Sequence, residues 1–194
     1  MTNLYINQIF IRFSSQIFCG LKPATLFNIS ADRFSEKALE NWKKVIQEQG
    51  LSIQVIEKIS GSILIFVYDF MWLKKLIDDS FIQAYLRGKG YSNPCNTREC
   101  LNILFKRLQN AESFPHEVGV FLGYPIEDVI QFEEKQGKCC KFCGYWKSYC
   151  NPEEAKLCCE KYKQCSRMCT QWFDEGYSVP QIIKKYKKMA QQAA

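Results

Sequence analysis

Long apolar runs and export signals are scarce in this chain. The longest apolar run, from Ile63 to Tyr68, is much shorter than the roughly 20 residues that a membrane-spanning helix needs, so it predicts a buried strand. The moderately apolar N-terminus is interrupted by Gln8, Arg12 and Gln16, and it lacks a basic leader and a small-residue cleavage site. These features argue against a membrane span and a signal peptide, and they favour a cytoplasmic protein.

Motifs of the common enzyme classes are also missing. The chain has no phosphate-binding loop of the form G-x-G-x-x-G or G-x-x-x-x-G-K-[ST], no G-x-S-x-G elbow and no H-E-x-x-H. Its one histidine, His116, is expected in the first turn of a short helix beside Glu117. A lone histidine there is more often structural than catalytic. His116 and Glu117 are the candidate catalytic residues if the fold brings them together, or brings a cysteine to His116.

The first half of the chain is predicted to mix helices and strands. Ser35 is a suitable N-cap for a helix over residues 36–49. Residues 51–58 and 62–68 are rich in β-branched side chains and flank a Ser-Gly turn, which predicts a β-hairpin. Residues 69–86 are expected to be helical, with a break near Asp79-Ser80.

The second half is predicted to be mainly helical. Each expected helix has a capping or first-turn residue, and these lie at Asn96, Pro115, Pro125, Asn151 and Ser178. The fold class is therefore α+β, with a small antiparallel β-sheet and helices in the N-terminal half, packed on a mainly α-helical C-terminal half. Residues 1–90 and 91–194 are expected to form one integrated domain.

Eleven cysteines are present, and eight of them lie between residues 139 and 169. Because the count is odd and no export signal is found, reduced thiols are the default expectation. On a helix beginning at Pro152, Cys158, Cys165 and Cys169 would share one face, which predicts that these thiols pack in the core.

A metal site is the alternative interpretation of these cysteines. Cys140 and Cys143 form a Cys-x-x-Cys knuckle, which can give two thiolates to one tetrahedral ion. Cys165 and Cys169, one helical turn apart, could complete a zinc or iron–sulfur site. A thioredoxin-like role for the knuckle is less favoured, because a helix and a glycine precede it where a strand is needed.

The segment from Glu117 to Val129 has the spacing of a helix-turn-helix. Its second helix would carry four acidic side chains near the DNA, at Glu127, Asp128, Glu133 and Glu134. Because contacts with phosphates supply most of the affinity for DNA, this face predicts packing and makes nucleic-acid binding unlikely. In contrast, the aromatic and basic side chains of residues 139–147 could stack on a flat ligand.

Three segments resemble a known family. They are FPHEVGVFLGYPIEDVIQF at residues 114–132, GKCCKFCGYWKSY at 137–149 and the region around 162–165, and they are similar to the bacterial family catalogued as domain of unknown function 3793. Residues 19–24 resemble that family's Gly-x-Lys-Pro segment, which adds Lys22 to the candidates. The family's association with flavodoxin and iron-uptake genes implies a role in redox or iron metabolism.

The leading hypothesis is a cytosolic, non-catalytic binding or accessory protein in iron or redox metabolism. Its partner would be a small molecule or a redox protein, and the candidate ligand-binding residues are Lys22, Tyr124, Tyr145, Trp146 and Lys147. The alternatives are an enzyme that uses His116 with a cysteine or Glu117, and a nucleic-acid binder.

Overall fold

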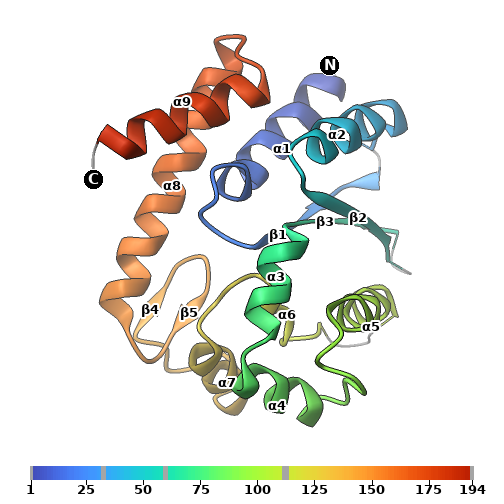
Figure 1. The fold of residues 1–194 in the computed structure, drawn as a ribbon, viewed down its shortest axis with the longest axis vertical. Helices are drawn as coiled ribbons and strands as arrows, with labels where there is room; N and C mark the ends of the chain where they lie inside the picture. The colour runs from blue at the N-terminus through green and yellow to red at the C-terminus, as the bar shows by residue number, and fades with distance from the viewer. Residues whose placement is uncertain (1, 32–33, 59–60, 111–113, 193–194) are drawn as a thin grey trace.

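The three-stranded sheet at the centre of the molecule is antiparallel. A computed structural model describes residues 2–31, 34–58, 61–110 and 114–192 (Figure 1). The strands are β1 (Ala24–Ile29), β2 (Ser52–Glu57) and β3 (Ile63–Tyr68), in the order β1-β3-β2. Strand β3 lies between the other two and alternates its side chains between two apolar cores, so the continuous apolar run is a buried strand, as predicted.

Helices cover both faces of this sheet. One face packs against α1 (Thr2–Phe18), α2 (Glu36–Glu48), α8 (Pro152–Asp174) and α9 (Val179–Gln192). The other face packs against helices from the middle of the chain, which are α3 (Phe70–Ile77), α4 (Ser80–Gly88), α5 (Thr97–Asn110), α6 (Val118–Phe121) and α7 (Ile126–Glu134). These layers confirm the α+β prediction.

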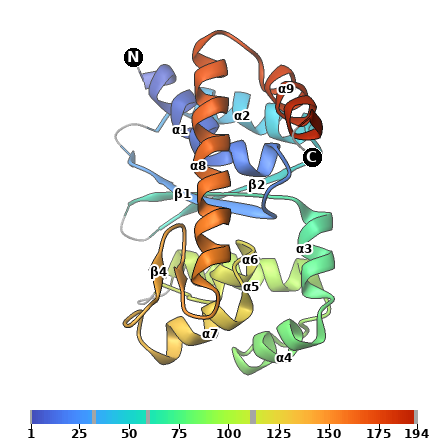
Figure 2. The ribbon, with the colours of Figure 1, turned by 90° about the vertical axis from the view of Figure 1, so that its left-hand side faces the viewer.

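Helix α8 connects the two layers. It runs from the level of α7, past the edge of the sheet, to α9 at the opposite end (Figure 2). A short hairpin of β4 (Phe142–Cys143) and β5 (Lys147–Ser148) precedes it and packs beside α7. None of the helices in the described ranges is both long and apolar enough to span a bilayer.

Local capping explains why several helices begin where the sequence predicts. The Ser35 side chain accepts a hydrogen bond from the Ala38 amide, and the Asn151 side chain accepts one from Glu154. Asp79 accepts from two amides at the start of α4, which separates α4 from α3 at the predicted break. These caps satisfy amide groups that have no partner within their own helix.

Two elements of the N-terminal region were not predicted. Helix α1 buries Ile6, Phe10 and Ile11, whereas Gln8 and Arg12 face solvent. Gln16, the third polar residue that interrupts the apolar sequence, is buried and donates a hydrogen bond to the Tyr145 hydroxyl. Strand β1 was missed because its pairing partner, β3, lies far away in the sequence.

Candidate functional site

A cavity of about 450 Å³ lies between the α6–α7 corner and the β4–β5 hairpin. Val118, Leu122 and Val129 line its apolar part, together with several aromatic side chains. The exposed residues Phe114 and His116 also belong to its lining. We call this cavity the aromatic pocket.

The aromatic pocket collects most of the residues that the sequence singled out. Its lining includes His116, Tyr124, Tyr145, Trp146 and Lys147. Cys143 of the knuckle also lines it. The fold therefore brings together two segments, 114–132 and 143–147, that the sequence alone could not place side by side.

Glu117 lies elsewhere. Its buried carboxylate accepts hydrogen bonds from Arg107 at 2.6 Å and from the Tyr91 hydroxyl at 3.2 Å. Glu117 is not among the residues that line the aromatic pocket. The structure thus gives this carboxylate a structural ion pair between α5 and the start of α6.

Asp128 holds the hairpin against α7. Its carboxylate accepts hydrogen bonds from the Trp146 indole at 2.8 Å and from the amides of Tyr149 and Cys150 at 2.7 and 3.0 Å. Burial alone would raise the pKa of Asp128, but these hydrogen bonds outweigh burial and hold the pKa below its usual value. The sequence analysis counted Asp128 only among the acidic side chains of this helix, so its organising role was missed.

Stacked rings form a rigid wall of the pocket. Trp146 stacks on Tyr124, with ring centroids 5.2 Å apart and planes 21° from parallel. At another part of the lining, the rings of His116 and Phe132 pack edge to face, with their centroids 4.9 Å apart. The Lys147 ammonium donates a hydrogen bond to the Gly137 carbonyl at 2.7 Å. The pocket therefore combines flat apolar surfaces with one cation and one imidazole.

Two glycines allow the backbone to approach its neighbours closely. A Cβ atom at Gly144 would lie 2.5 Å from the Cys159 sulfur on α8. Gly123 has a φ of +78°, and a Cβ atom there would lie 2.5 Å from the Pro23 ring. The Gly123 contact packs the Lys22-Pro23 segment against the α6–α7 corner, and the Gly144 contact packs the hairpin against α8.

Lys22 is buried among tyrosines. Only 4% of its surface is exposed, and its ammonium lies 5.5 Å from the Tyr124 ring centroid, 6.0 Å from that of Tyr145 and 5.7 Å from that of Tyr162. Across the described ranges, no acidic side chain forms an ion pair with it. Burial lowers the pKa of Lys22 to about 8, although Cys158 and Cys159 oppose this effect.

Lys22 does not line the aromatic pocket, although Tyr124 and Tyr145 do. Its ammonium faces the two rings that form part of the pocket wall. The geometry therefore gives Lys22 a position behind the wall, from which it can orient the rings and add positive potential to the site.

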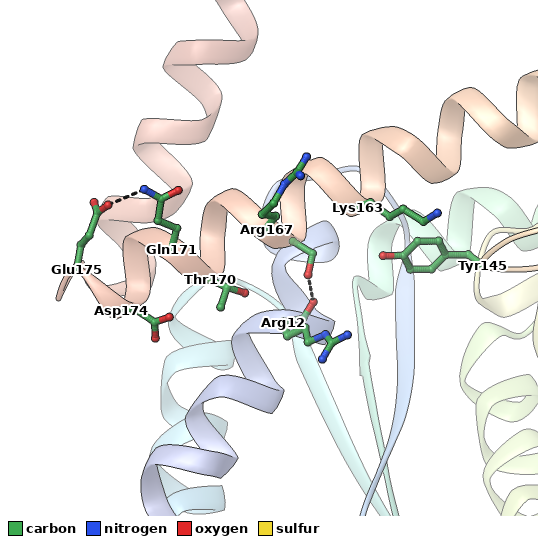
Figure 3. Close-up of a pocket in the computed structure, with 9 residues that line it drawn as sticks. Arg12, Tyr145, Lys163, Arg167, Thr170, Gln171, Asp174 and Glu175 are labelled. Carbon is green, nitrogen blue, oxygen red and sulfur yellow. Dashed lines mark hydrogen bonds between the residues drawn. The ribbon is translucent and has the colours of Figure 1, made fainter.

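A second, polar groove lies between α1 and α8 (Figure 3). Arg12, Lys163 and Arg167 line it, with Tyr145 near one end and Glu175 near the other. Tyr145 thus contributes to both the groove and the aromatic pocket, and its hydroxyl accepts a hydrogen bond from Gln16 at 3.2 Å.

The predicted thiols fall into two separate settings. Cys140 and Cys143 lie at the surface hairpin, whereas Cys165 and Cys169 are fully buried on α8. The buried pair is joined by Cys19, and among the described residues these three sulfurs are the group close enough to share a metal ion. The helical-wheel prediction is wrong for Cys158, which is half-buried, because its neighbour Cys159 points into the core.

The three buried sulfurs influence one another's ionisation. Hydrogen bonds from Cys169 and Cys19 lower the pKa of Cys165. The same contact with Cys165 raises the pKa of Cys169, and it raises that of Cys19. The three thiols therefore titrate together and not as independent groups.

Comparison with known proteins gives a family and no closer relative. No curated protein and no solved structure matches this chain. Residues 10–183 match the model of the family described as "Protein of unknown function (DUF3793)". The match includes the Lys22 segment, the α6–α7 corner and the knuckle, so the chain belongs to this family, as its resemblance predicted.

Proposed function

We propose that this protein is a non-catalytic binding protein that takes a flat small molecule with an anionic group into the aromatic pocket. We further propose that the ligand belongs to redox or iron metabolism. The observation that carries the proposal is that one cavity gathers Tyr124, Tyr145, Trp146 and Lys147.

The size and lining of the pocket favour this class of ligand. About 450 Å³ lies within the range of small-molecule sites, which are mostly apolar with a few polar groups that fix orientation. The stacked pair of Tyr124 and Trp146 offers a flat surface beside the cavity. Lys147 and His116 are the side chains that would receive an anionic group.

The hydrogen bonds around the pocket favour ligand binding over acid–base catalysis. Asp128 is occupied by three donors and Glu117 by Arg107, so neither carboxylate is free to pair with His116. The same hydrogen bonds hold the walls in place, which reduces the entropic cost of binding. A redox or iron setting is supported by the role that the resemblance to the family implies.

Riboflavin 5′-phosphate is a suitable test ligand, because it combines a flat redox-active ring with an anionic group. We expect its fluorescence to be quenched on titration with the protein, with a Kd of about 1 μM, or about 8 kcal/mol of binding free energy. Riboflavin, which lacks the phosphate, should bind about tenfold more weakly, and the Lys147→Met variant should abolish that difference.

A pair of tryptophan substitutions provides a matched control. Cys143→Trp places a bulky ring in the pocket lining, whereas Cys140→Trp places it on the same hairpin outside that lining. We expect only the first to weaken flavin binding, by at least tenfold. Equal affinity in both variants, or no flavin binding at all, would count against the proposal.

An enzyme remains the second candidate, because Cys143 and His116 line the same pocket. In that case His116 would activate the Cys143 thiol as a nucleophile. The rate at which iodoacetamide alkylates Cys143 distinguishes the two hypotheses. An enzyme predicts that His116→Ala slows alkylation at least tenfold at pH 7, and a binding protein predicts little change.

A nucleic-acid binder is less favoured. Helix α7 carries Glu127, Glu133 and Glu134, and Glu133 forms an ion pair with Lys89 at 2.7 Å. A helix with this charge would repel phosphates. Tight, salt-dependent binding to a duplex would contradict this conclusion.

A further inference from the structure

The buried thiols lie where two helices cross, on the opposite side of the sheet from α7. Cys19 follows the last turn of α1, and Cys165 and Cys169 are one turn apart on α8. The sulfur of Cys169 lies 3.7 Å from that of Cys19 and 4.0 Å from that of Cys165. All three sulfurs lie within 4.8 Å of one another.

We propose that Cys19, Cys165 and Cys169 form a zinc-binding site. This site is independent of the aromatic pocket, and it differs from the site predicted from the sequence, because Cys19 takes the place of the surface knuckle. Apolar packing alone does not require three sulfurs, from α8 and from the residue after α1, to lie within 4.8 Å of one another.

The sulfur separations match what a zinc ion requires. Zn–S bonds of about 2.3 Å in a tetrahedron place the sulfurs about 3.8 Å apart. The separations of Cys169 from Cys19 and from Cys165, 3.7 and 4.0 Å, bracket that value. The third pair, Cys19 and Cys165, also stays within reach of a common ion.

Charge favours a divalent ion at this position. The three sulfurs contact one another, and Cys165 also contacts the Ser15 carbonyl oxygen; none of these partners is a cation. Three buried thiolates without a cation would be very costly, and a zinc ion offsets two of their three charges. A monovalent ion such as Cu⁺ would leave two negative charges in the core.

The backbone around the site is already ordered. The Cys19 amide donates to the Ser15 carbonyl at 2.9 Å, and the Cys165 thiol lies 3.6 Å from the same oxygen. Tyr186 of α9 packs against the core that contains the cluster. Because the thiols are buried beneath this helix, zinc would bind as the protein folds and would add to its stability.

The test uses the full-length protein purified without oxygen and freed of metal by a chelator during refolding. To remove competing thiols, six exposed or half-buried cysteines are replaced by serine in a background variant. They are Cys95, Cys139, Cys140, Cys143, Cys150 and Cys158. We expect this variant to bind one equivalent of Zn²⁺ in competition with a chromophoric chelator, and X-ray absorption to show three sulfur ligands at about 2.3 Å.

Removing one ligand should abolish the site. Cys19→Ser in the same background should weaken Zn²⁺ binding by on the order of 100-fold or more. If that variant fails to fold, alkylation of the unsubstituted protein supplies the answer, since Zn²⁺ should protect Cys19, Cys165 and Cys169 together. Cys100, a buried thiol outside the cluster, is the internal control.

Several results would overturn the proposal. One is that Cys19→Ser still binds Zn²⁺. Another is that replacing only Cys140 and Cys143 abolishes Zn²⁺ binding. A third is a Cys19–Cys169 disulfide in protein that is kept under reducing conditions. One equivalent of Cu⁺ bound with no Zn²⁺ binding would likewise contradict the assignment of zinc.

Discussion

Lys22 is the residue whose position is hardest to explain by stability alone. Burying an ammonium without an acidic partner costs free energy, and cation–π contacts with the tyrosine rings offset only part of that cost. Such a residue is expected where function requires it. Its place behind the wall of the aromatic pocket, in a segment that the family match includes, supports a positioning role in ligand binding.

Lys22→Met should therefore stabilise the protein. The lowering of its pKa from 10.5 to about 8 corresponds to at most about 3 kcal/mol of unfavourable free energy at neutral pH. We expect urea unfolding at pH 7 to show a gain of about 1–3 kcal/mol. A loss of stability at pH 7 would mean that the tyrosine contacts outweigh the cost of burial.

The pH dependence gives an independent check of the same residue. Between about pH 8 and 10.5 the unfolded chain holds the Lys22 proton and the folded protein does not, so stability from this group rises with pH. The advantage of Lys22→Met over the parent should therefore shrink across this range. A constant difference would show that the Lys22 pKa is not lowered.

Asp128 should contribute a large share of the hairpin's stability. Asp128→Ala leaves three donors without a partner, and we expect a loss of about 3 kcal/mol at pH 7. Because the pKa of Asp128 is lowered in the fold, its contribution is present above its unfolded pKa and disappears as pH falls through the folded pKa. The variant and parent should therefore converge in strong acid.

Glu127→Ala is the matched control for Asp128. Glu127 is the exposed neighbour on the same turn of α7, so its removal should change stability by no more than about 0.5 kcal/mol. Urea unfolding of both variants at pH 7 and pH 3 measures the effect. Equal losses in the two variants would argue against the anchoring role of Asp128.

At the scale of elements, the contact between Gly123 and Pro23 joins the α6–α7 corner to the Lys22 segment. Gly123→Ala combines a left-handed backbone with a clash against the proline ring. Gly176→Ala is the control, because that glycine has a φ of +92° with no atom near a new Cβ. We expect Gly176→Ala to cost about 1–2 kcal/mol, and Gly123→Ala to cost clearly more. Equal losses in thermal unfolding would mean that the Pro23 contact is unimportant.

Elements specified by local signals were predictable from the sequence. The caps at Ser35, Asp79 and Asn151 each act within four residues, and the helices that follow them begin as expected. In contrast, helix α1 and strand β1 depend on partners far away in the sequence. Local patterns cannot identify such partners.

The site shows the same division between local and distant information. Tyr124, Trp146 and Lys147 could be chosen as candidates from their residue types and segments, but their meeting in one cavity required the fold. Cys19 lies 150 residues from Cys169, and no spacing rule links them. The structural role of Glu117 likewise depends on Arg107, which lies on a different helix.

For the molecule as a whole, ligand binding should appear as added stability. A ligand that binds only the folded state at 100 times its Kd adds about 2.7 kcal/mol. For a chain of this length that corresponds to a rise in Tm of about 5–10 °C. Scanning calorimetry with riboflavin 5′-phosphate measures this effect, and Cys143→Trp should reduce the rise while Cys140→Trp should not. An unchanged Tm at saturating flavin would contradict binding to the folded state.

The most direct test is a crystal structure of the protein with riboflavin 5′-phosphate. The account predicts that the flavin ring lies in the aromatic pocket beside Tyr124 and Trp146, with its phosphate near Lys147. A pocket that stays empty at saturating flavin, or a flavin that occupies the groove of Arg12, Lys163 and Arg167 instead, would contradict the account.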